Sequence, residues 1–183
     1  VNRPKYIRAM HPKTEISPTR AAVQKILSVG WWGQAKIHGH RAQIHVPSDE
    51  TEEIVVFNRT GQPHAKRLPP ALADELRRLF KPRHGWNVID SEWLKGDDRL
   101  FVFDFLKRED QLLEDQPYAE RYALLPRVYA SPKIETLPPL RTVDQCMAVL
   151  ADPAPEIEGL VFKAPKTRGF LDSTIVRCRK AAT

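Results

Sequence analysis

Pairs of short strands separated by single helices are the feature that most limits how this chain can fold. Apolar and polar residues alternate along residues 33–46 (GQAKIHGHRAQIHV), and a polar PSDET turn leads into a second such run at 52–59. The pattern returns at 86–94 and 99–106, where a Gly-Asp-Asp turn separates the two runs. Strands joined by short turns pair antiparallel, so the chain is predicted to be α+β with mainly antiparallel sheets.

Helices and further strands are predicted around these pairs. The first helix lies within 17–30, with Ser17 as its N-cap and Gly30 as its stop. The other elements are helices at 69–80, within 118–129 (ended by Pro126) and at 142–152, and strands near 133–137, at 158–164 and at 173–180. The Pro-rich stretches between elements are too short for interdomain linkers, so residues 1–183 are expected to form a single domain.

Composition narrows the functional classes. Of the 183 residues, 42% are hydrophobic, which is enough for one substantial core. Lysine and arginine exceed aspartate and glutamate by 29 to 23, and the resulting net charge of +6 favours a polyanionic partner. No apolar run reaches membrane-spanning length and no signal peptide opens the chain, so no membrane partner and a cytoplasmic location are expected. Cys146 and Cys178 are isolated, which argues against a disulfide or zinc framework.

Charged residues stand on the predicted strands, where a purely structural sheet would not need them. Walker, GxGxxG, HExxH and GxSxG motifs are all absent. Taken singly, the residues have ordinary explanations: Lys36 as a solvated strand lysine, Phe103 as a core aromatic, and the glutamates as partners of surface arginines. Their order along the chain is the informative property. The charged residues are Lys36, Arg41, Arg59, Glu92, Glu158, Lys163, Arg177 and Arg179.

In that order they resemble the motifs of the covalent nucleotidyltransferases, the superfamily of ATP-dependent DNA ligases, RNA ligases and mRNA capping enzymes. The segment Lys36-Ile37-His38-Gly39 resembles the KxDG nucleophile motif, and EGLVFK (158–163) matches E-G-x-V-x-K in full. The stretch 103–125 is similar to the corresponding part of ATP-dependent DNA ligases. The other corresponding segments are Arg59-Thr60-Gly61, Asp90-Ser91-Glu92 for D-G-E, FVFDFL (101–106), and IVRCR (175–179) for W-x-K-x-K.

The resemblance implies a covalent mechanism. Lys36 would attack the α-phosphate of ATP, expel pyrophosphate and become lysyl-AMP, which is catalysis through an amine nucleophile. Lys163, Arg177 and Arg179 would be catalytic cations that neutralise the phosphate as its charge grows. Glu158 would be the ligand of Mg²⁺ or Mn²⁺, hard cations that prefer carboxylate and phosphate oxygen.

The resemblance also implies a set of residues that bind the nucleotide. Glu92 would accept a hydrogen bond from the ribose, Phe103 would stack on adenine, and Gln34 would read the adenine amino group. Arg41 and Arg59 would hold phosphate or ribose, and later the 5′-phosphate of a nick. The full set is Gln34, Ile37, Arg41, Arg59, Glu92, Phe103 and Lys163.

Several positions depart from the superfamily pattern. His38 replaces the usual Asp, as in one branch of the RNA ligases, whereas Arg41 follows the KxDGxR habit of DNA ligases. The last motif carries Arg177 and Arg179 where lysines are usual, and Lys180 is an alternative phosphate contact. An arginine fork does not imitate a compact ammonium, so this replacement changes the geometry while keeping the charge.

The sequence therefore predicts two antiparallel sheets with flanking helices around a nucleotide cleft, in the catalytic domain of an ATP-dependent ligase. Nicked duplex DNA, in replication or repair, is the expected substrate. An RNA ligase and a non-catalytic nucleic-acid-binding relic are alternatives, and a GTP-using capping enzyme is a more distant one.

Because the chain ends just past the last motif, no C-terminal OB-fold is expected within it. One resulting expectation is that an OB-fold domain or protein acts in trans. Another is that this chain adenylates itself weakly but still seals a nick that is already adenylated.

Overall fold

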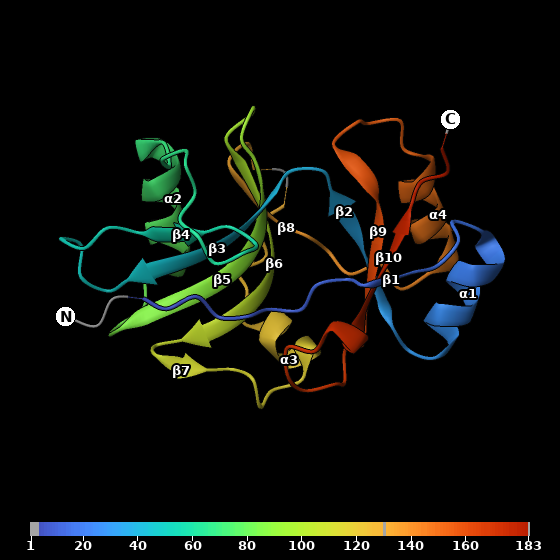
Figure 1. The fold of residues 1–183 in the computed structure, drawn as a ribbon, viewed down its shortest axis with the longest axis horizontal. Coiled ribbons are helices and arrows are strands. Elements are labelled where there is room, and N and C mark those ends of the chain that lie inside the picture. Colours follow the sequence, from blue (N-terminus) through green and yellow to red (C-terminus); the bar gives the residue numbers. More distant parts are fainter. Residues whose placement is uncertain (1–3, 130, 183) are drawn as a thin grey trace.

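Two β-sheets stand side by side in the computed structural model, which describes residues 4–129 and 131–182 (Figure 1). The six-stranded sheet has the order β4-β3-β5-β6-β7, with β8 also paired to β6. The four-stranded sheet has the order β1-β10-β9-β2. Only the β1–β10 and β6–β8 pairs are parallel within these described residues, which confirms the predicted α+β architecture with mainly antiparallel sheets.

The strands carry the following bounds. Those of the six-stranded sheet are β3 (His40–Pro47), β4 (Val55–Phe57), β5 (Trp86–Leu94), β6 (Arg99–Arg108), β7 (Gln111–Leu112) and β8 (Ile134–Thr136). Those of the four-stranded sheet are β1 (Thr14–Glu15), β2 (Trp32–Ile37), β9 (Ile157–Lys163) and β10 (Ile175–Arg179). The two-residue strands β1 and β7 are too short for a periodic pattern, and the sequence did not predict them.

Helices cover the outer faces of both sheets (Figure 1). The helices α1 (Arg20–Ser28) and α4 (Val143–Ala151) pack on the four-stranded sheet, and α2 (Pro70–Phe80) packs on the six-stranded sheet. Leu72, Leu76 and Phe80 are buried and form the apolar face of α2. The short helix α3 (Tyr118–Ala123) lies against β6, and a 3₁₀ turn (Asp172–Thr174) precedes β10. No helix of the described residues is both long enough and apolar enough to cross a bilayer.

The predicted cap of α1 was wrong. Thr19, rather than Ser17, caps the helix, because its side chain accepts a hydrogen bond of 3.2 Å from the backbone N–H of Ala22. Pro18 therefore precedes the cap and lies outside the helix. Gly30 follows the last turn with φ of 92°, as its predicted role as a stop requires.

The run 33–46, predicted as one strand, is two strands in two different sheets. β2 ends at Ile37 in the four-stranded sheet, and β3 begins at His40 in the six-stranded sheet. Gly39 permits the crossing, because a Cβ atom at this position would lie only 2.6 Å from the carbonyl oxygen of Trp93. The break places Lys36 and Arg41 on different sheets.

A buried ion pair fixes α3 to β6. The guanidinium of Arg121 donates from Nε to Oδ1 of Asp104 over 3.0 Å and from Nη2 to Oδ2 over 3.1 Å. Arg121 is fully buried, and its Nη1 also donates to the carbonyl of Gln116 over 2.8 Å. A buried pair is tolerated when its hydrogen bonds are satisfied in this way. Its consequence is that the first turn of α3, with Tyr118, faces the space between the sheets.

Candidate active site

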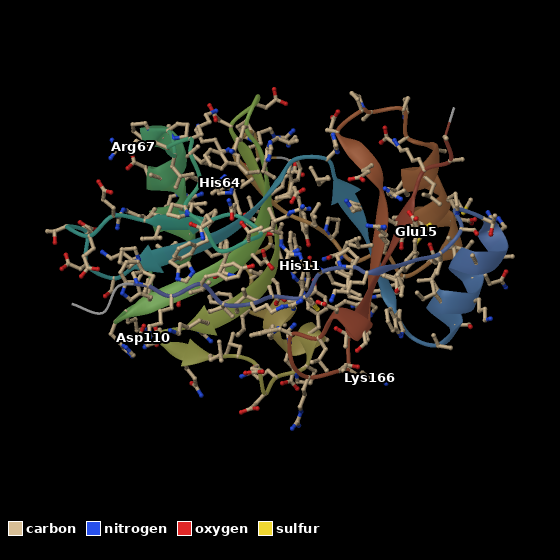
Figure 2. The ribbon with its side chains drawn as sticks, viewed as in Figure 1. His11, Glu15, His64, Arg67, Asp110 and Lys166 are labelled. Carbon is tan, nitrogen blue, oxygen red and sulfur yellow. The ribbon has the colours of Figure 1, made fainter. Side chains whose placement is uncertain are left out.

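A cleft of about 630 Å³ lies between the two sheets. Its walls come from β2, the start of β3, the turn at 58–60, β9 and β10, and from the N-terminal segment that joins the sheets. In Figure 2, His11 of that segment lies in the middle of the molecule, between the sheets. The predicted residues that line the cleft are Gln34, Lys36, Ile37, Arg41, Arg59, Glu92, Phe103, Glu158, Lys163 and Arg177.

Lys36 and Glu158 form an ion pair at this cleft. Nζ of Lys36 lies 2.6 Å from Oε2 of Glu158, and the two side chains are 23% and 26% exposed. The ring Nδ1 of His38 lies 3.6 Å from the same carboxylate oxygen. Burial acts to raise the pKa of Glu158, but the hydrogen bond and charge of Lys36, with His38, hold that pKa below its usual value. The amine is therefore held in place by a carboxylate that stays ionised.

Lys163 is a buried cation with no carboxylate partner among the described residues. Its side chain is 2% exposed, and Nζ donates to the Tyr118 hydroxyl over 3.3 Å. The same Nζ lies 4.2 Å from the ring centroid of Phe103 and 4.6 Å from that of Tyr118. Burial lowers the pKa of Lys163 to about 7. An ammonium held by two aromatic faces and one hydroxyl is well suited to receive an anion from the cleft.

Arg41 is locked by Asp90 on the neighbouring strand β5. Its Nε lies 2.7 Å from Oδ1 and its Nη2 lies 2.5 Å from Oδ2, and Nη2 also donates to the Met10 carbonyl. The guanidinium carbon lies 5.1 Å from the centroid of the Phe103 ring. This bidentate pair uses Nε and Nη2, so Nη1 is the guanidinium nitrogen left for a further acceptor.

Glu92 is a mostly buried carboxyl on β5. It accepts a hydrogen bond of 3.3 Å from the backbone N–H of Gly39, in the crossing between the sheets. Burial raises the pKa of Glu92 to about 7, against the opposing charge of Arg41. Near neutral pH this carboxyl therefore exists in both protonation states, and it is able either to donate or to accept a hydrogen bond.

The amide of Gln34 is engaged at both ends. Its Nε2 donates to the Leu137 carbonyl over 3.2 Å, and its Oε1 accepts from the Tyr118 hydroxyl over 3.2 Å. The side chain is 1% exposed yet lines the cleft. Its orientation is thus fixed by the protein, with one N–H and one lone pair left over.

Arg177 and Arg179 lie on the same side of β10 but in different surroundings. Arg177 lines the cleft, and its Nε lies 3.7 Å from Oε1 of Glu15. Arg179 lies outside the cleft, where its guanidinium pairs with both oxygens of Glu15 at 2.5 Å and 3.1 Å. Figure 2 shows Glu15 beside β10, well to the side of His11. Lys180, the alternative phosphate contact, donates instead to the carbonyls of Asp152 and Ala154.

Solved structures resemble this fold, although the sequence matches no protein-family model and no curated protein significantly. A mycobacterial DNA ligase D complexed with ATP and MES is 18% identical, with a TM-score of 0.59 over 81% of this chain and 54% of that chain. The ligase domain of LigD from M. tuberculosis is 17% identical, with a TM-score of 0.63 over 91% of this chain and 60% of that one. An archaeal ATP-dependent RNA ligase is 14% identical, with a TM-score of 0.53 over 93% and 48%.

This chain has the fold of the ligase structures it resembles. The likeness confirms the predicted architecture of two mainly antiparallel sheets with flanking helices. The chain spans about half the length of the ligases it resembles, from 48% to 60% of the three described.

In this ligase-like fold, three residues that the sequence did not single out contact the predicted site. Tyr118 contacts both Gln34 and Lys163, and His11 lines the cleft. His64 donates from Nε2 to the Arg41 carbonyl over 2.8 Å. Tyr118 had a sequence signal, because it lies in the ligase-like stretch 103–125. His11 and His64 lie in irregular segments, where no periodicity places a side chain.

Glu158 is a suitable ligand for a divalent cation in this cleft. Within residues 4–129 and 131–182, no group of three or more His, Cys, Asp or Glu side chains comes together as a metal cage. Mg²⁺ is commonly held by one or two carboxylates together with waters and substrate phosphates. A single ionised carboxylate at the cleft, as Glu158 provides, fits that mode of binding.

Proposed function

We propose that this chain is the catalytic domain of an ATP-dependent polynucleotide ligase that forms lysyl-AMP at Lys36. The observation that carries the proposal is the pairing of Lys36 with Glu158 at one end of a cleft that also holds the buried ammonium of Lys163. The similar structures include a DNA ligase complexed with ATP and an ATP-dependent RNA ligase, which supports the choice of reaction.

In the proposed first step, the Nζ lone pair of Lys36 attacks the α-phosphorus of ATP, a P–N bond forms, and pyrophosphate leaves. Nζ must lose a proton before it attacks, because an ammonium has no lone pair. Lys163 and Arg177 offset the negative charge that grows on the phosphorus oxygens. Mg²⁺ or Mn²⁺, held by Glu158, would supply further positive charge at the phosphates.

In the same proposal, residues of both sheets bind the nucleoside. Glu92 bonds the ribose hydroxyl, Phe103 stacks on adenine, and the lone pair left on Gln34 accepts the adenine amino group. Arg59 in the exposed turn and Nη1 of Arg41 hold phosphate oxygens, first of ATP and then of the 5′ end.

In the later steps AMP passes from Lys36 to a 5′-phosphate, and a 3′-hydroxyl then displaces AMP to seal the nick. Duplex DNA is the proposed substrate, on the strength of Arg41 and the ligase-like stretch 103–125. A second candidate, RNA ligation, is favoured by His38, which stands where DNA ligases carry Asp. DNA and RNA nicks that differ only in the 3′-terminal sugar would separate the two candidates.

The test is incubation of the protein with α-labelled ATP and Mg²⁺, followed by denaturing electrophoresis. An acid-labile labelled band is expected for the wild type and for Lys25→Ala, a control that removes an exposed lysine of α1. The band should be absent in Lys36→Ala. A pre-adenylated nick tests the last step without self-adenylation. Failure to take label and failure to seal that nick would together refute the proposal in favour of a non-catalytic nucleic-acid-binding protein.

A further inference from the structure

Tyr118, at the start of α3, is the one side chain of the described residues that hydrogen-bonds to both Gln34 and Lys163. It is 1% exposed, and its position is set by the buried Arg121–Asp104 pair that fixes α3 to β6. The guanidinium of Arg121 also lies 5.5 Å from the centroid of the Tyr118 ring. The hydroxyl is thus placed rigidly, by an anchor outside the cleft.

The contacts of this hydroxyl have a definite direction. Tyr118 carries one proton, and the acceptors within reach are the Phe103 carbonyl at 2.5 Å and Oε1 of Gln34 at 3.2 Å. Burial raises the pKa of Tyr118 well above its usual value, so the hydroxyl keeps that proton. The hydroxyl oxygen therefore accepts the hydrogen bond of 3.3 Å that Nζ of Lys163 donates.

We infer that Tyr118 is a positioning residue for the proposed adenylation reaction. Its hydroxyl holds the ammonium of Lys163 toward the phosphates and the amide of Gln34 toward the nucleobase. One side chain on α3 thereby sets the distance between the phosphate-binding and base-binding ends of the cleft. The positioning role rests on the proposed function, but the hydrogen bond between Lys163 and Tyr118 is testable without any reaction.

The effect of the hydroxyl on Lys163 follows from the surroundings of the ammonium. Asp104 and Asp90 favour its charged form, whereas Arg41, Arg121 and burial oppose it. None of these four charged groups hydrogen-bonds to Nζ, so the Tyr118 oxygen is the direct partner among the described residues. Removal of that oxygen leaves the ammonium against aromatic carbon alone, and the charged form is less favoured.

The first test is a proton titration of Lys163 by NMR of ¹³C,¹⁵N-labelled lysine side chains, with the signal assigned by its loss in Lys163→Met. In Tyr118→Phe the titration midpoint of Lys163 is expected to fall by about one pH unit. Tyr122→Phe is the matched control, since its hydroxyl lies on the same helix and donates instead to the Leu137 carbonyl. A Lys163 midpoint unchanged in Tyr118→Phe, or lowered equally in both variants, would overturn the inference.

The second test is a double-mutant cycle on ATP binding, measured by calorimetry near neutral pH. Tyr118→Phe is expected to weaken ATP binding about fivefold, because less of Lys163 is charged. In a Lys163→Met background the same change should cost less, because only the contact with Gln34 is then left to lose. Full additivity of the two losses would count against the inference. If wild-type protein neither binds ATP nor takes label at Lys36, the proposed function fails, while the Lys163 titration still decides on the contact.

Discussion

The Nζ atom of Lys36 lies 2.6 Å from Oε2 of Glu158, across the antiparallel pair of β2 and β9. This distance makes a strong charge-assisted hydrogen bond, which holds the lysine side chain in place. The proposed attack needs the Nζ lone pair to face the α-phosphorus, whereas in the resting pair Nζ is engaged with the carboxylate. Glu158 must therefore exchange this partner, and a divalent cation is the partner that the proposal supplies.

Replacing Glu158 with Gln should reduce label transfer to Lys36 on the order of a hundredfold. The amide keeps the shape of the side chain but removes the negative charge that would hold the metal. ATP affinity should fall less than the labelling rate, because Lys163 and Arg177 remain in the cleft. Glu156→Gln, two residues earlier and outside the cleft, is the control. Wild-type labelling by Glu158→Gln would show that this carboxylate has no part in the reaction.

Arg177 and Arg179 should differ in their effect on the proposed reaction, although the resemblance implied the same role for both. Arg177→Ala removes a cation that lines the cleft, and label transfer is expected to fall about tenfold or more. Arg179→Ala removes only an exposed pair with Glu15, so labelling is expected to stay within about twofold of the wild type. Rates measured at saturating ATP compare the two. Equal losses would place Arg179 in contact with the substrate during the reaction.

This difference between the arginines marks a limit of sequence reasoning. Side chains two residues apart on a strand point to the same face, so Arg177 and Arg179 share one side of β10. The position of Glu15 decides which of them is free to face the cleft, and Glu15 lies on the two-residue strand β1 at the far end of the chain. A strand of that length has no periodicity of its own, so its pairing follows only from the completed fold.

The fold was easier to predict from the sequence than the surroundings of these arginines, because it depends on patterns that are local in the sequence. The strand 86–94 has the predicted bounds, and α2 begins one residue after its predicted start. The error at 33–46 arose because apolar and polar residues alternate on both sides of the break, at Ala35–Ile37 and again at Ala42–Val46, although the chain between them passes from one sheet to the other. The need for a glycine at position 39 follows from its close approach to the Trp93 carbonyl, and Trp93 is far from Gly39 in the sequence.

Gly39→Ala tests this crossing. A Cβ atom there would meet the Trp93 carbonyl oxygen at 2.6 Å and Cγ of Glu92 at 3.3 Å, so backbone must move. The free energy of unfolding is expected to fall by about 1–3 kcal/mol, and Glu92 should shift with the displaced loop. Gly96→Ala is the control, because no atom lies within 4 Å of a Cβ at that position. Urea denaturation compares the variants, and equal stability of the two would remove the steric explanation of the strand break.

Glu92 should make the stability of the protein fall as pH rises through the weakly acidic range. Its pKa is raised by burial to about 7, against a usual value of 4.5, so between these values the folded state binds more protons than the unfolded state. Stability attributable to this group is therefore highest below about pH 4.5 and decreases until about pH 7. Glu92→Gln removes the titration, so its stability relative to the wild type should improve by about 1–3 kcal/mol between about pH 5 and pH 8.

Urea denaturation at the two pH values measures this change, with Glu114→Gln as a control for the loss of one exposed negative charge. The expected sign distinguishes Glu92 from a carboxylate held ionised by a cation, for which stability would rise with pH in its own titration range. The result bears on function, since a carboxyl that is half protonated near neutral pH is able to donate as well as accept a hydrogen bond. Parallel stability curves for Glu92→Gln and the wild type would mean that the Arg41 charge outweighs burial, and that Glu92 faces the cleft as an ordinary carboxylate.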